Sequence, residues 1–260
     1  MTDPLPWRDE REIRVEAEPA RVWAAWAEPA HVARWFADEG HGSLEPGGEI
    51  VHVFHGHGEH RYRVLEVEPE RRLVLEGEMD GIAFRQETVL TYRDGVTVLT
   101  LVHSGFGSAD PDSEITQGID SGWAMALAVF KHYVERWYGR DKVSLSLFRP
   151  ATFDYTELVQ ERYAAGLHTW LTAEVSIGSS DPPRLRSGLA LRGHELVRTD
   201  HEIARTWEEL DGVLELKAFG SAPDARVLGV RVSSWSPNAE ARLAALRPEL
   251  EAAVERLARA

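Results

Sequence analysis

The sequence predicts an α+β fold, in which a curved antiparallel sheet wraps around a long helix, and it predicts this arrangement twice along the chain. Three observations support it. Apolar and polar side chains alternate with a period of two within each half, each half closes with a long amphipathic helix, and the connections between expected strands are short. A chain of 260 residues can bury two such cores. We expect domains at residues 1–140 and 141–260.

The first expected elements are a strand and two short helices. Ile13 and Val15 alternate with charged residues, as in a half-buried strand. Pro19 follows, and because a proline in the first turn of a helix costs no hydrogen bond, we expect a helix from this residue. A second short helix is expected to begin at Pro29 and to stop before Gly40.

An antiparallel meander is expected next, because the period of the sequence changes to two from the motif GGEI onward. Its joints are the turn sequences HGHG, EPERR, MDG and RDG, and connections of this length permit only antiparallel neighbours. The expected strands are residues 49–55, 61–67, 72–76, 84–92 and 97–103.

One long helix is expected after a polar loop at residues 107–121. The segment GWAMALAVFKHYVERWY carries one apolar stripe at helical spacing, which consists of Trp123, Leu127, Phe130 and Val134. The apolar face of the sheet needs a cover, and this helix has the necessary length. A curved sheet that grips one helix tends to leave a cavity between them.

The second half repeats this order of elements in blurred form. KVSLSLFRP and AEVSIGS are expected strands, with the helical segment FDYTELVQERYAAGLHTWL between them. GVLELKAF and RVLGVRVSSWS are expected to form a hairpin around GSAPDA, before a closing helix with Ser236 and Asn238 as candidate caps. Residues 180–210 fit a strand or a helix equally. The repeated order predicts a tandem duplication with a degenerate second copy.

Composition and charge exclude several classes of function. The chain has no cysteine, and therefore neither disulfides nor thiolate chemistry. Its formal net charge of −14 would repel a phosphate backbone, so nucleic acid is not an expected partner. No apolar run is long enough for a membrane span, and the N-terminus lacks the pattern of a secretory signal. We expect a cytoplasmic protein.

Five motifs in the first half, taken together, resemble a known superfamily. They are VWAAWAEPAHVARWFA, PGGE, VLEVEPERRLVLEG, VTVLTLVHSGF and GWAMALAVFKHYV, in the right order. The sequence is similar to the SRPBCC superfamily of START-like helix-grip proteins, and especially to the branch named for the activator of the ninety-kilodalton heat-shock chaperone. The resemblance covers about residues 10–140, and the second half shares only the order of elements.

The resemblance implies a sheet wrapped around the last helix, with an apolar pocket between the two. Members of the superfamily bind or transport hydrophobic small molecules, some are polyketide cyclases or dehydratases, and others regulate the chaperone. Fold alone does not choose among these activities. We expect binding of an apolar or aromatic small molecule. The alternatives are a cyclase- or hydrolase-type enzyme that uses a pocket histidine, and an interaction protein that regulates a chaperone.

Four histidines lie close together in the segment EIVHVFHGHGEHRYRV and raise the question of a metal site. They are His52, His55, His57 and His60. Zinc needs three or four converging ligands, and the segment lacks the helical HExxH spacing that places two imidazoles on one face. We therefore expect a solvated hairpin tip at the rim of the pocket, with no metal and no cofactor. Alternation places His52 on one face with Phe54, without deciding which face is inward.

His103 continues an apolar row on the last expected strand of the first half. A two-residue turn at Asp94 and Gly95 would pair it with Gln86, whereas a three-residue loop would pair it with Glu87. An Asp-Gly sequence is a strong signal for the two-residue turn, which favours Gln86. Glu87 would support acid–base catalysis, whereas Gln86 would orient a ligand or satisfy the imidazole.

The lining of the pocket is expected from aromatic residues, although core packing is the common role of such rings. Trp35 ends the short helix over the mouth of the sheet, Trp123 opens the long helix, and Tyr62 offers a hydroxyl. The full set of candidate ligand-binding residues is Trp35, His52, Phe54, Tyr62, Phe84, Gln86, Glu87, His103 and Trp123.

Overall fold

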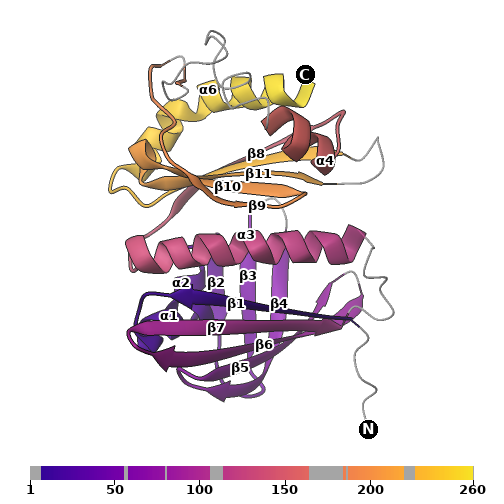
Figure 1. Ribbon diagram of the computed structural model, residues 1–260, viewed down its shortest axis with the longest axis vertical. Helices are drawn as coiled ribbons and strands as arrows, with labels where there is room; N and C mark the ends of the chain where they lie inside the picture. The colour runs from indigo at the N-terminus through magenta and orange to yellow at the C-terminus, as the bar shows by residue number, and fades with distance from the viewer. Residues whose placement is uncertain are drawn as a thin grey trace. The chain divides into compact units, whose positions relative to one another are not determined.

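The computed structural model describes residues 7–55, 58–79, 81–105, 114–163, 184–185, 187–219 and 226–259. The chain forms two compact units (Figure 1). The first comprises Met1–Asp120 and Phe130–Arg140, and the second comprises Ser121–Val129 and Asp141–Ala260, so that one long helix contributes to both. Each unit contains an antiparallel sheet and a long helix, which confirms the predicted α+β class.

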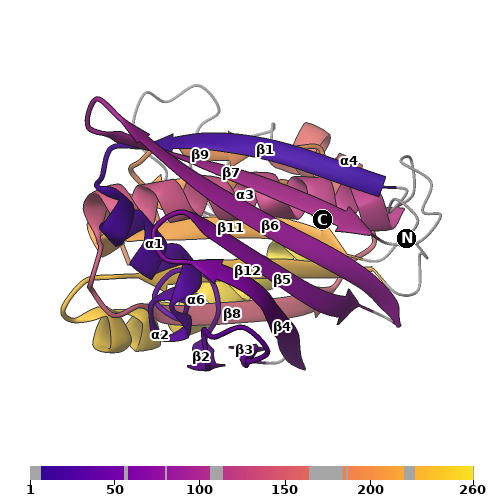
Figure 2. The same ribbon diagram turned by 90° about the horizontal axis from the view of Figure 1, so that it is seen from below.

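The first unit is a seven-stranded antiparallel sheet that is twisted beneath the helix α3 (Figures 1 and 2). Across the sheet the strands lie in the order β1-β7-β6-β5-β4-β3-β2, so the first strand is hydrogen-bonded to the last. The elements are β1 (Trp7–Val15), α1 (Pro19–Ala27), α2 (Pro29–Val32), β2 (Glu39–Gly42), β3 (Glu49–Phe54), β4 (Gly58–Glu68), β5 (Arg72–Met79), β6 (Ile82–Arg93), β7 (Val96–Gly105) and α3 (Glu114–Arg136).

Alternation along the strands gives this sheet one buried face. Every second residue of β7, from Thr97 to Gly105, is buried, and the residues between them are more exposed. On the same side, the ring of Phe130 on α3 meets the rings of Trp26 and Trp35 at centroid distances of 5.1 and 4.9 Å. We call this buried side the inner face of the first sheet.

Three elements of the first unit differ from the sequence prediction. The long helix begins at Glu114, within the segment expected to be a polar loop. Its polar Asp120 is exposed and accepts a hydrogen bond from Arg11 of β1, so this polar residue is accommodated in the helix on the solvent side. The helix α2 ends at Val32, earlier than expected. The edge strand β2 was not expected, because the polar sequence EGHG gives no alternation and the strand forms through backbone pairing with β3.

The second unit has a five-stranded antiparallel sheet in the order β8-β12-β11-β10-β9, again with its first strand beside its last. In both units the other strands follow in chain order and a long helix comes after the last strand. The elements are β8 (Val143–Pro150), α4 (Tyr155–Glu157), a π-helical turn (Leu158–Tyr163), β9 (Glu195–Arg198), β10 (Glu202–Trp207), a 3-10 turn (Glu208–Leu210), β11 (Gly212–Phe219), β12 (Val227–Ser234) and α6 (Ala239–Arg259).

Most expected elements of the second half are confirmed where the structure describes them. The segment KVSLSLFRP forms β8, the expected hairpin is β11 and β12, and the closing helix is α6. The expected strand AEVSIGS and the loop GSAPDA lie outside the described residues. The ambiguous segment 180–210 contains the strands β9 and β10.

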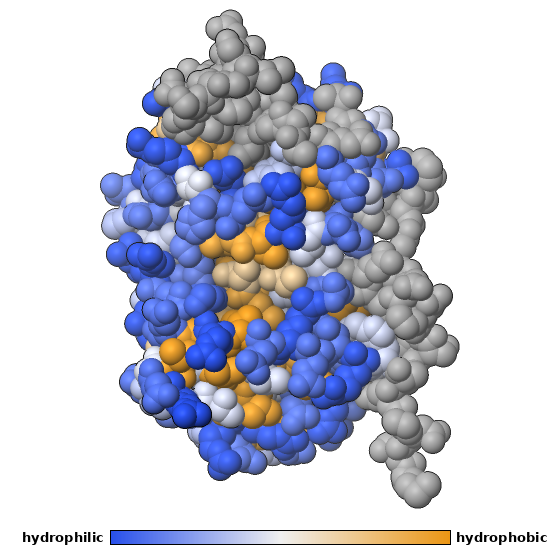
Figure 3. All heavy atoms as spheres, in the orientation of Figure 1, coloured by the Kyte–Doolittle hydropathy of each residue, from blue (hydrophilic) through white to orange (hydrophobic). Residues whose placement is uncertain are grey.

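Hydrophilic residues predominate on the face drawn in Figure 3. Among the described residues, Tyr92 is a large hydrophobic residue with an exposed side chain, and its hydroxyl donates a hydrogen bond to Glu18. Within the same residues, no helix combines the length and hydropathy that crossing a bilayer requires.

Candidate functional site

A continuous row of aromatic and imidazole rings crosses the inner face of the first sheet. We define the ring row as Trp7, His103, Phe84, Tyr62, His52 and Phe36. Its central contacts join His103 to Phe84 at a centroid distance of 4.8 Å and Phe84 to Tyr62 at 5.9 Å. These residues come from β1, β7, β6, β4, β3 and the turn after α2, so the row spans nearly the whole sheet.

The two ends of the row differ in exposure. Trp7, His103, Phe84 and Tyr62 are buried, whereas His52 is only half-buried. Half-buried rings also surround His52. We call His52, Phe36, Phe54 and His60 the rim. The Phe36 ring contacts those of His52 and Phe54, the Phe54 ring contacts that of His60, and each of the four residues remains partly exposed. The contact between His52 and Tyr62, at a centroid distance of 5.2 Å, joins the rim to the buried part. The face of β3 that carries His52 and Phe54 is therefore the inner one.

The ring of Phe84 lies over a glycine at the centre of the row. Tyr62, Gly77 and Phe84 are register partners on β4, β5 and β6. A β-carbon at position 77 would come within 2.5 Å of Cζ of Phe84 and within 3.0 Å of its Cε atoms. The absence of a side chain on Gly77 therefore allows the Phe84 ring to occupy the space above β5, and the row crosses this strand without interruption.

The predicted pairing of His103 with Gln86 is confirmed. Asp94 and Gly95 have φ angles of 55° and 82°, the left-handed conformation that a two-residue hairpin turn requires at both central positions. This turn sets the register of β6 and β7, in which Gln86 lies opposite His103. Both side chains are buried on the inner face.

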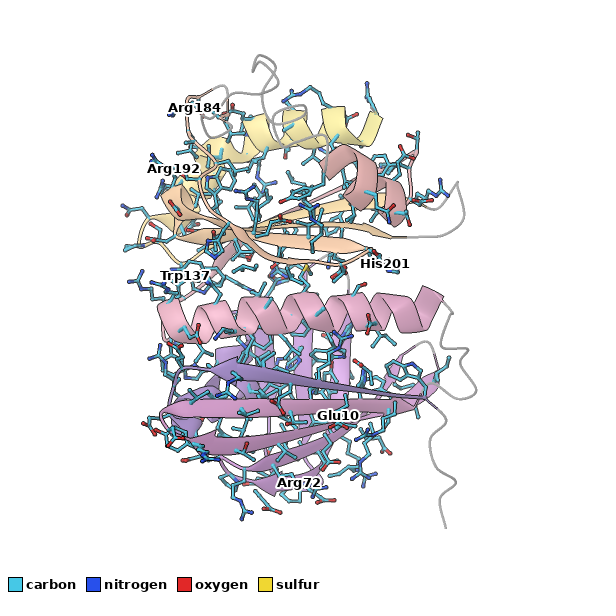
Figure 4. The ribbon with its side chains drawn as sticks, viewed as in Figure 1. Glu10, Arg72, Trp137, Arg184, Arg192 and His201 are labelled. Atoms are coloured by element: carbon cyan, nitrogen blue, oxygen red, sulfur yellow. The ribbon has the colours of Figure 1, made fainter. Side chains whose placement is uncertain are left out.

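Glu87 points to the other side of the sheet. It is the register partner of Val102, and its carboxylate accepts a hydrogen bond of 2.8 Å from Nε of Arg72. Arg72 also pairs with Glu66, and Figure 4 shows it on the side of the sheet away from α3. The alternative register, which would have placed Glu87 beside His103, is therefore wrong. A role for Glu87 in ligand binding stays a prediction.

The pattern of single strands did not reveal that β1 contributes to the site. Asp9 of β1 lies opposite His103, and Trp7 of β1 contacts the His103 ring at a centroid distance of 5.9 Å. The carboxylate of Asp9 accepts a hydrogen bond of 2.6 Å from Nε of Arg11. Asp9 and Trp7 could have been placed beside His103 only from the topology of the fold, in which the first strand pairs with the last.

Burial keeps both inner imidazoles uncharged at neutral pH. Burial lowers the pKa of His103 from 6.5 to about 4. The pKa of His52 is likewise lowered to about 4, mainly by burial and to a smaller extent by the nearby His60. Burial also raises the pKa of Tyr62 above the usual value for a phenol. Among the described residues, the buried Nδ1 of His52 has no hydrogen-bond partner. The site therefore offers neutral donors and acceptors.

The other candidates of the histidine-rich segment are dispersed. His52 and His60 face each other across β3 and β4, whereas Nε2 of His55 lies 2.9 Å from a carboxylate oxygen of Glu39 with both side chains largely exposed. His57 lies outside the described residues. In the part of the chain that the structure describes, no three potential ligands come together in a way that could hold a metal ion.

The two tryptophan candidates occupy different positions. Trp35 is buried, stacks on Trp26 at a centroid distance of 5.8 Å, and donates a 2.8 Å hydrogen bond from Nε1 to the carbonyl oxygen of Ala25. These contacts are those of a core residue that also borders Phe36 of the rim. Trp123 is half-buried on α3. A role for either in ligand binding stays a prediction.

Among the residues of the second unit that the structure describes, the corresponding face of the sheet shows no such row. One register row across β8, β12, β11 and β10 consists of Leu147, Val230, Leu216 and Ile203, and all four are buried in one hydrophobic cluster. The two units therefore share a strand order and differ in what fills the buried face. In the register rows compared, the first sheet has rings with polar atoms where the second has aliphatic side chains, although the cluster around the second row also includes Phe153, Tyr163 and Trp207.

Residues 16–135 match the family described as Activator of Hsp90 ATPase homolog 1-like protein. The resemblance predicted from the sequence motifs is thereby confirmed over this segment. A comparison with curated proteins gives no match.

Several solved structures are similar to parts or to most of the chain. CalU16 from Micromonospora echinospora is 25% identical, with 50% of this chain and 76% of that chain covered and a TM-score of 0.42. Aha1 from Colwellia psychrerythraea, solved as a dimer, is 17% identical, with coverages of 51% and 99% and a TM-score of 0.45. DynU16, from the dynemicin biosynthetic locus, is 18% identical, with 96% of each chain covered and a TM-score of 0.45.

Proposed function

We propose that the first unit binds one uncharged aromatic or apolar small molecule against the ring row. The observation that carries the proposal is the contrast in exposure along the row: half-buried rings at Phe36 and His52 lead directly into buried rings at Tyr62 and Phe84. Aromatic surfaces of this kind, with a few convergent polar atoms, are typical of small-molecule sites. A ligand that stacks on the rim extends the row toward solvent.

The second unit supports a functional rather than a packing role for these rings. In a sheet of the same strand order, the register row that contains Leu216 and Val230 is aliphatic, and the buried cluster around it, which includes Phe153, Tyr163 and Trp207, packs without an imidazole. A buried polar group that lacks a partner costs about 1–3 kcal/mol. Retaining His52 on the inner face, with Nδ1 lacking a partner in the described chain, is unfavourable unless a ligand completes it.

The charge state of the row favours a ligand without formal charge. His52 and His103 both have a pKa of about 4 and are neutral near pH 7, and the phenol of Tyr62 is neutral as well. The charged pair on this face, Asp9 and Arg11, is already joined by a 2.6 Å ion pair. An ionic ligand would lose its hydration without gaining a free counter-charge, which is costly. A hydroxyl or carbonyl group on the ligand would be matched by the neutral imidazole.

In this proposal the second unit is structural and arose by tandem duplication. The repeated strand order supports a common origin, and the aliphatic register row of the second sheet supports the loss of a binding role. Binding of one ligand molecule per chain follows from it.

Catalysis by His103 is a second candidate, which the position of Asp9 favours. A carboxylate opposite an imidazole is a common arrangement for acid–base chemistry, and Gln86 flanks the imidazole on its other side. The pKa of about 4 leaves His103 unprotonated at neutral pH, which suits a weak base rather than an acid. A catalytic role predicts that the bound molecule changes mass during incubation, and that His103→Gln slows this change by about 100-fold. Recovery of an unchanged molecule would contradict it.

The experiment that tests binding uses an uncharged probe, 1-naphthol, in isothermal titration calorimetry, together with native mass spectrometry of freshly purified protein. We expect one binding site per chain and a dissociation constant that rises about tenfold in Phe36→Ala, because one stacking ring is lost. Tyr92→Ala is the matched control, since Tyr92 is an exposed ring outside the row and should leave affinity unchanged. Equal effects of both variants, or no binding, would contradict the proposal.

A further inference from the structure

We propose that Phe84 is the residue that sets how far a ligand reaches into the ring row, and so selects ligands by length; this inference rests on the proposed function. Phe84 stands between Tyr62 on the rim side and His103 on the buried side, and it contacts the rings of both. A ligand that enters from the rim meets Phe84 before it reaches His103.

The orientation of the Phe84 ring makes it a barrier. Its plane is inclined by 74° to the ring of Tyr62 and by 85° to that of His103, so it presents an edge-to-face contact in both directions. Edge-to-face pairs of this geometry are attractive, which holds the ring upright between its neighbours. A planar ligand stacked along the row would have to displace it.

The Phe84 ring can lie in this position because Gly77 beneath it has no side chain. The Phe84 ring occupies the space that a side chain on β5 would fill, because a β-carbon at position 77 would lie only 2.5 Å from Cζ. On the other side, Gly105 is the register partner of Phe84 on β7 and likewise has no side chain. Phe84 is thus the one side chain on the inner face in the register row between Tyr62 and Trp7.

Removal of the ring should therefore open one connected space. With alanine at position 84, neither Gly77 nor Gly105 has a side chain that could fill the vacated volume, and backbone strands relax only partly around a cavity. A cavity lined by apolar and aromatic side chains can take up an aromatic ligand of matching size. The space would extend from Tyr62 to His103 and would admit a longer ligand than the wild-type row.

The test compares two neutral hydroxyarenes of different length, 1-naphthol with two fused rings and 1-pyrenol with four. Dissociation constants for both are measured by calorimetry in wild type, Phe84→Ala and Phe84→Leu. We expect the ratio of the 1-pyrenol constant to the 1-naphthol constant to fall about tenfold or more in Phe84→Ala, with a smaller fall in Phe84→Leu, which removes less volume. Phe153→Leu is the matched control, because Phe153 is fully buried in the core of the second unit and should not change the ratio.

The outcomes separate this inference from the proposed function. If 1-naphthol binds wild type and Phe36→Ala weakens it, but the ratio is the same in wild type and both Phe84 variants, ligand binding stands and the role of Phe84 is refuted. If neither probe binds wild type or any variant, both proposals fail. If Phe84→Ala does not fold, Phe84→Leu decides: a lowered ratio supports the inference, and an unchanged ratio overturns it.

Discussion

The ring of Phe84 sits so close to Gly77 that a methyl group on residue 77 would approach Cζ of the ring to 2.5 Å. Contacts this short force the ring or the strand to move, and overpacking of a buried site costs about 1–3 kcal/mol. Gly77→Ala should therefore lower the free energy of unfolding by about this amount, as measured by urea denaturation followed through amide signals of β5 and β6.

A double-mutant cycle isolates the contact between these residues. In a Phe84→Leu background the side chain at position 84 is smaller and flexible, so adding Gly77→Ala should cost less than it does in wild type, with a coupling energy of about 1 kcal/mol. Strictly additive effects would show that the destabilisation comes from β5 alone and not from the ring above it.

Stability should fall between about pH 6.5 and pH 4 because of the two buried imidazoles. The pKa values of His52 and His103 are lowered to about 4 in the folded protein, below the usual 6.5. In this window the unfolded chain binds protons that the folded chain does not, so the free energy of unfolding decreases as pH falls, by at most about 1.4 kcal/mol per pH unit for each histidine. Above pH 6.5 both states carry neutral imidazoles and the contribution is constant.

The variant His52→Gln/His103→Gln should flatten this decrease in the first unit, observed as urea midpoints of β6 and β7 amide signals from pH 4 to pH 7. A separate effect works in the opposite direction in the second unit. Burial raises the pKa of Glu202 to about 7, so the folded state binds a proton there between pH 7 and 4.5 that the unfolded state does not. The urea midpoints of the β10 amide signals are therefore compared separately, with Glu202→Gln as the control. An unchanged slope in the double variant would contradict the burial of the imidazoles.

A third prediction concerns how α1 is attached to the sheet. Nε1 of Trp26 donates a 2.9 Å hydrogen bond to the hydroxyl of Thr88, and both residues are buried. Thr88→Val preserves shape but removes this acceptor, which should destabilise the first unit by about 1–3 kcal/mol in urea denaturation. Thr91→Val on the same strand is the control, since Thr91 is exposed and should have little effect. Equal stability of the two variants would show that the hydrogen bond contributes nothing.

Local sequence patterns were sufficient for most of the first unit. The turn Asp94-Gly95 specified not only a hairpin but its register, and therefore the pairing of His103 with Gln86. Proline at positions 19 and 29 marked the beginning of α1 and α2 correctly. These features depend on residues close together in the chain, where backbone preference and alternation act directly.

Long-range features could not be predicted in this way. The pairing of Asp9 with His103 joins strands that are far apart in sequence, and it follows from the topology rather than from any pattern in β1. Alternation also does not decide which face of β3 is the inner one, because both faces contain apolar residues; the contacts of His52 with Tyr62 and Phe36 determine it. The position of the Phe84 ring over Gly77 depends on the register of β4, β5 and β6 together, which no single segment of the sequence specifies.

Ligand binding at the ring row is tested directly by photolabelling with an uncharged aryl diazirine, followed by mass-spectrometric mapping of the labelled residues. We expect label on peptides that contain Phe36, His52, Phe54 and Tyr62, and loss of that label when 1-naphthol is added in excess. The second unit, with its aliphatic face, should remain unlabelled. Label that 1-naphthol does not displace, or that concentrates on β10 and β11, would contradict a binding site on the ring row.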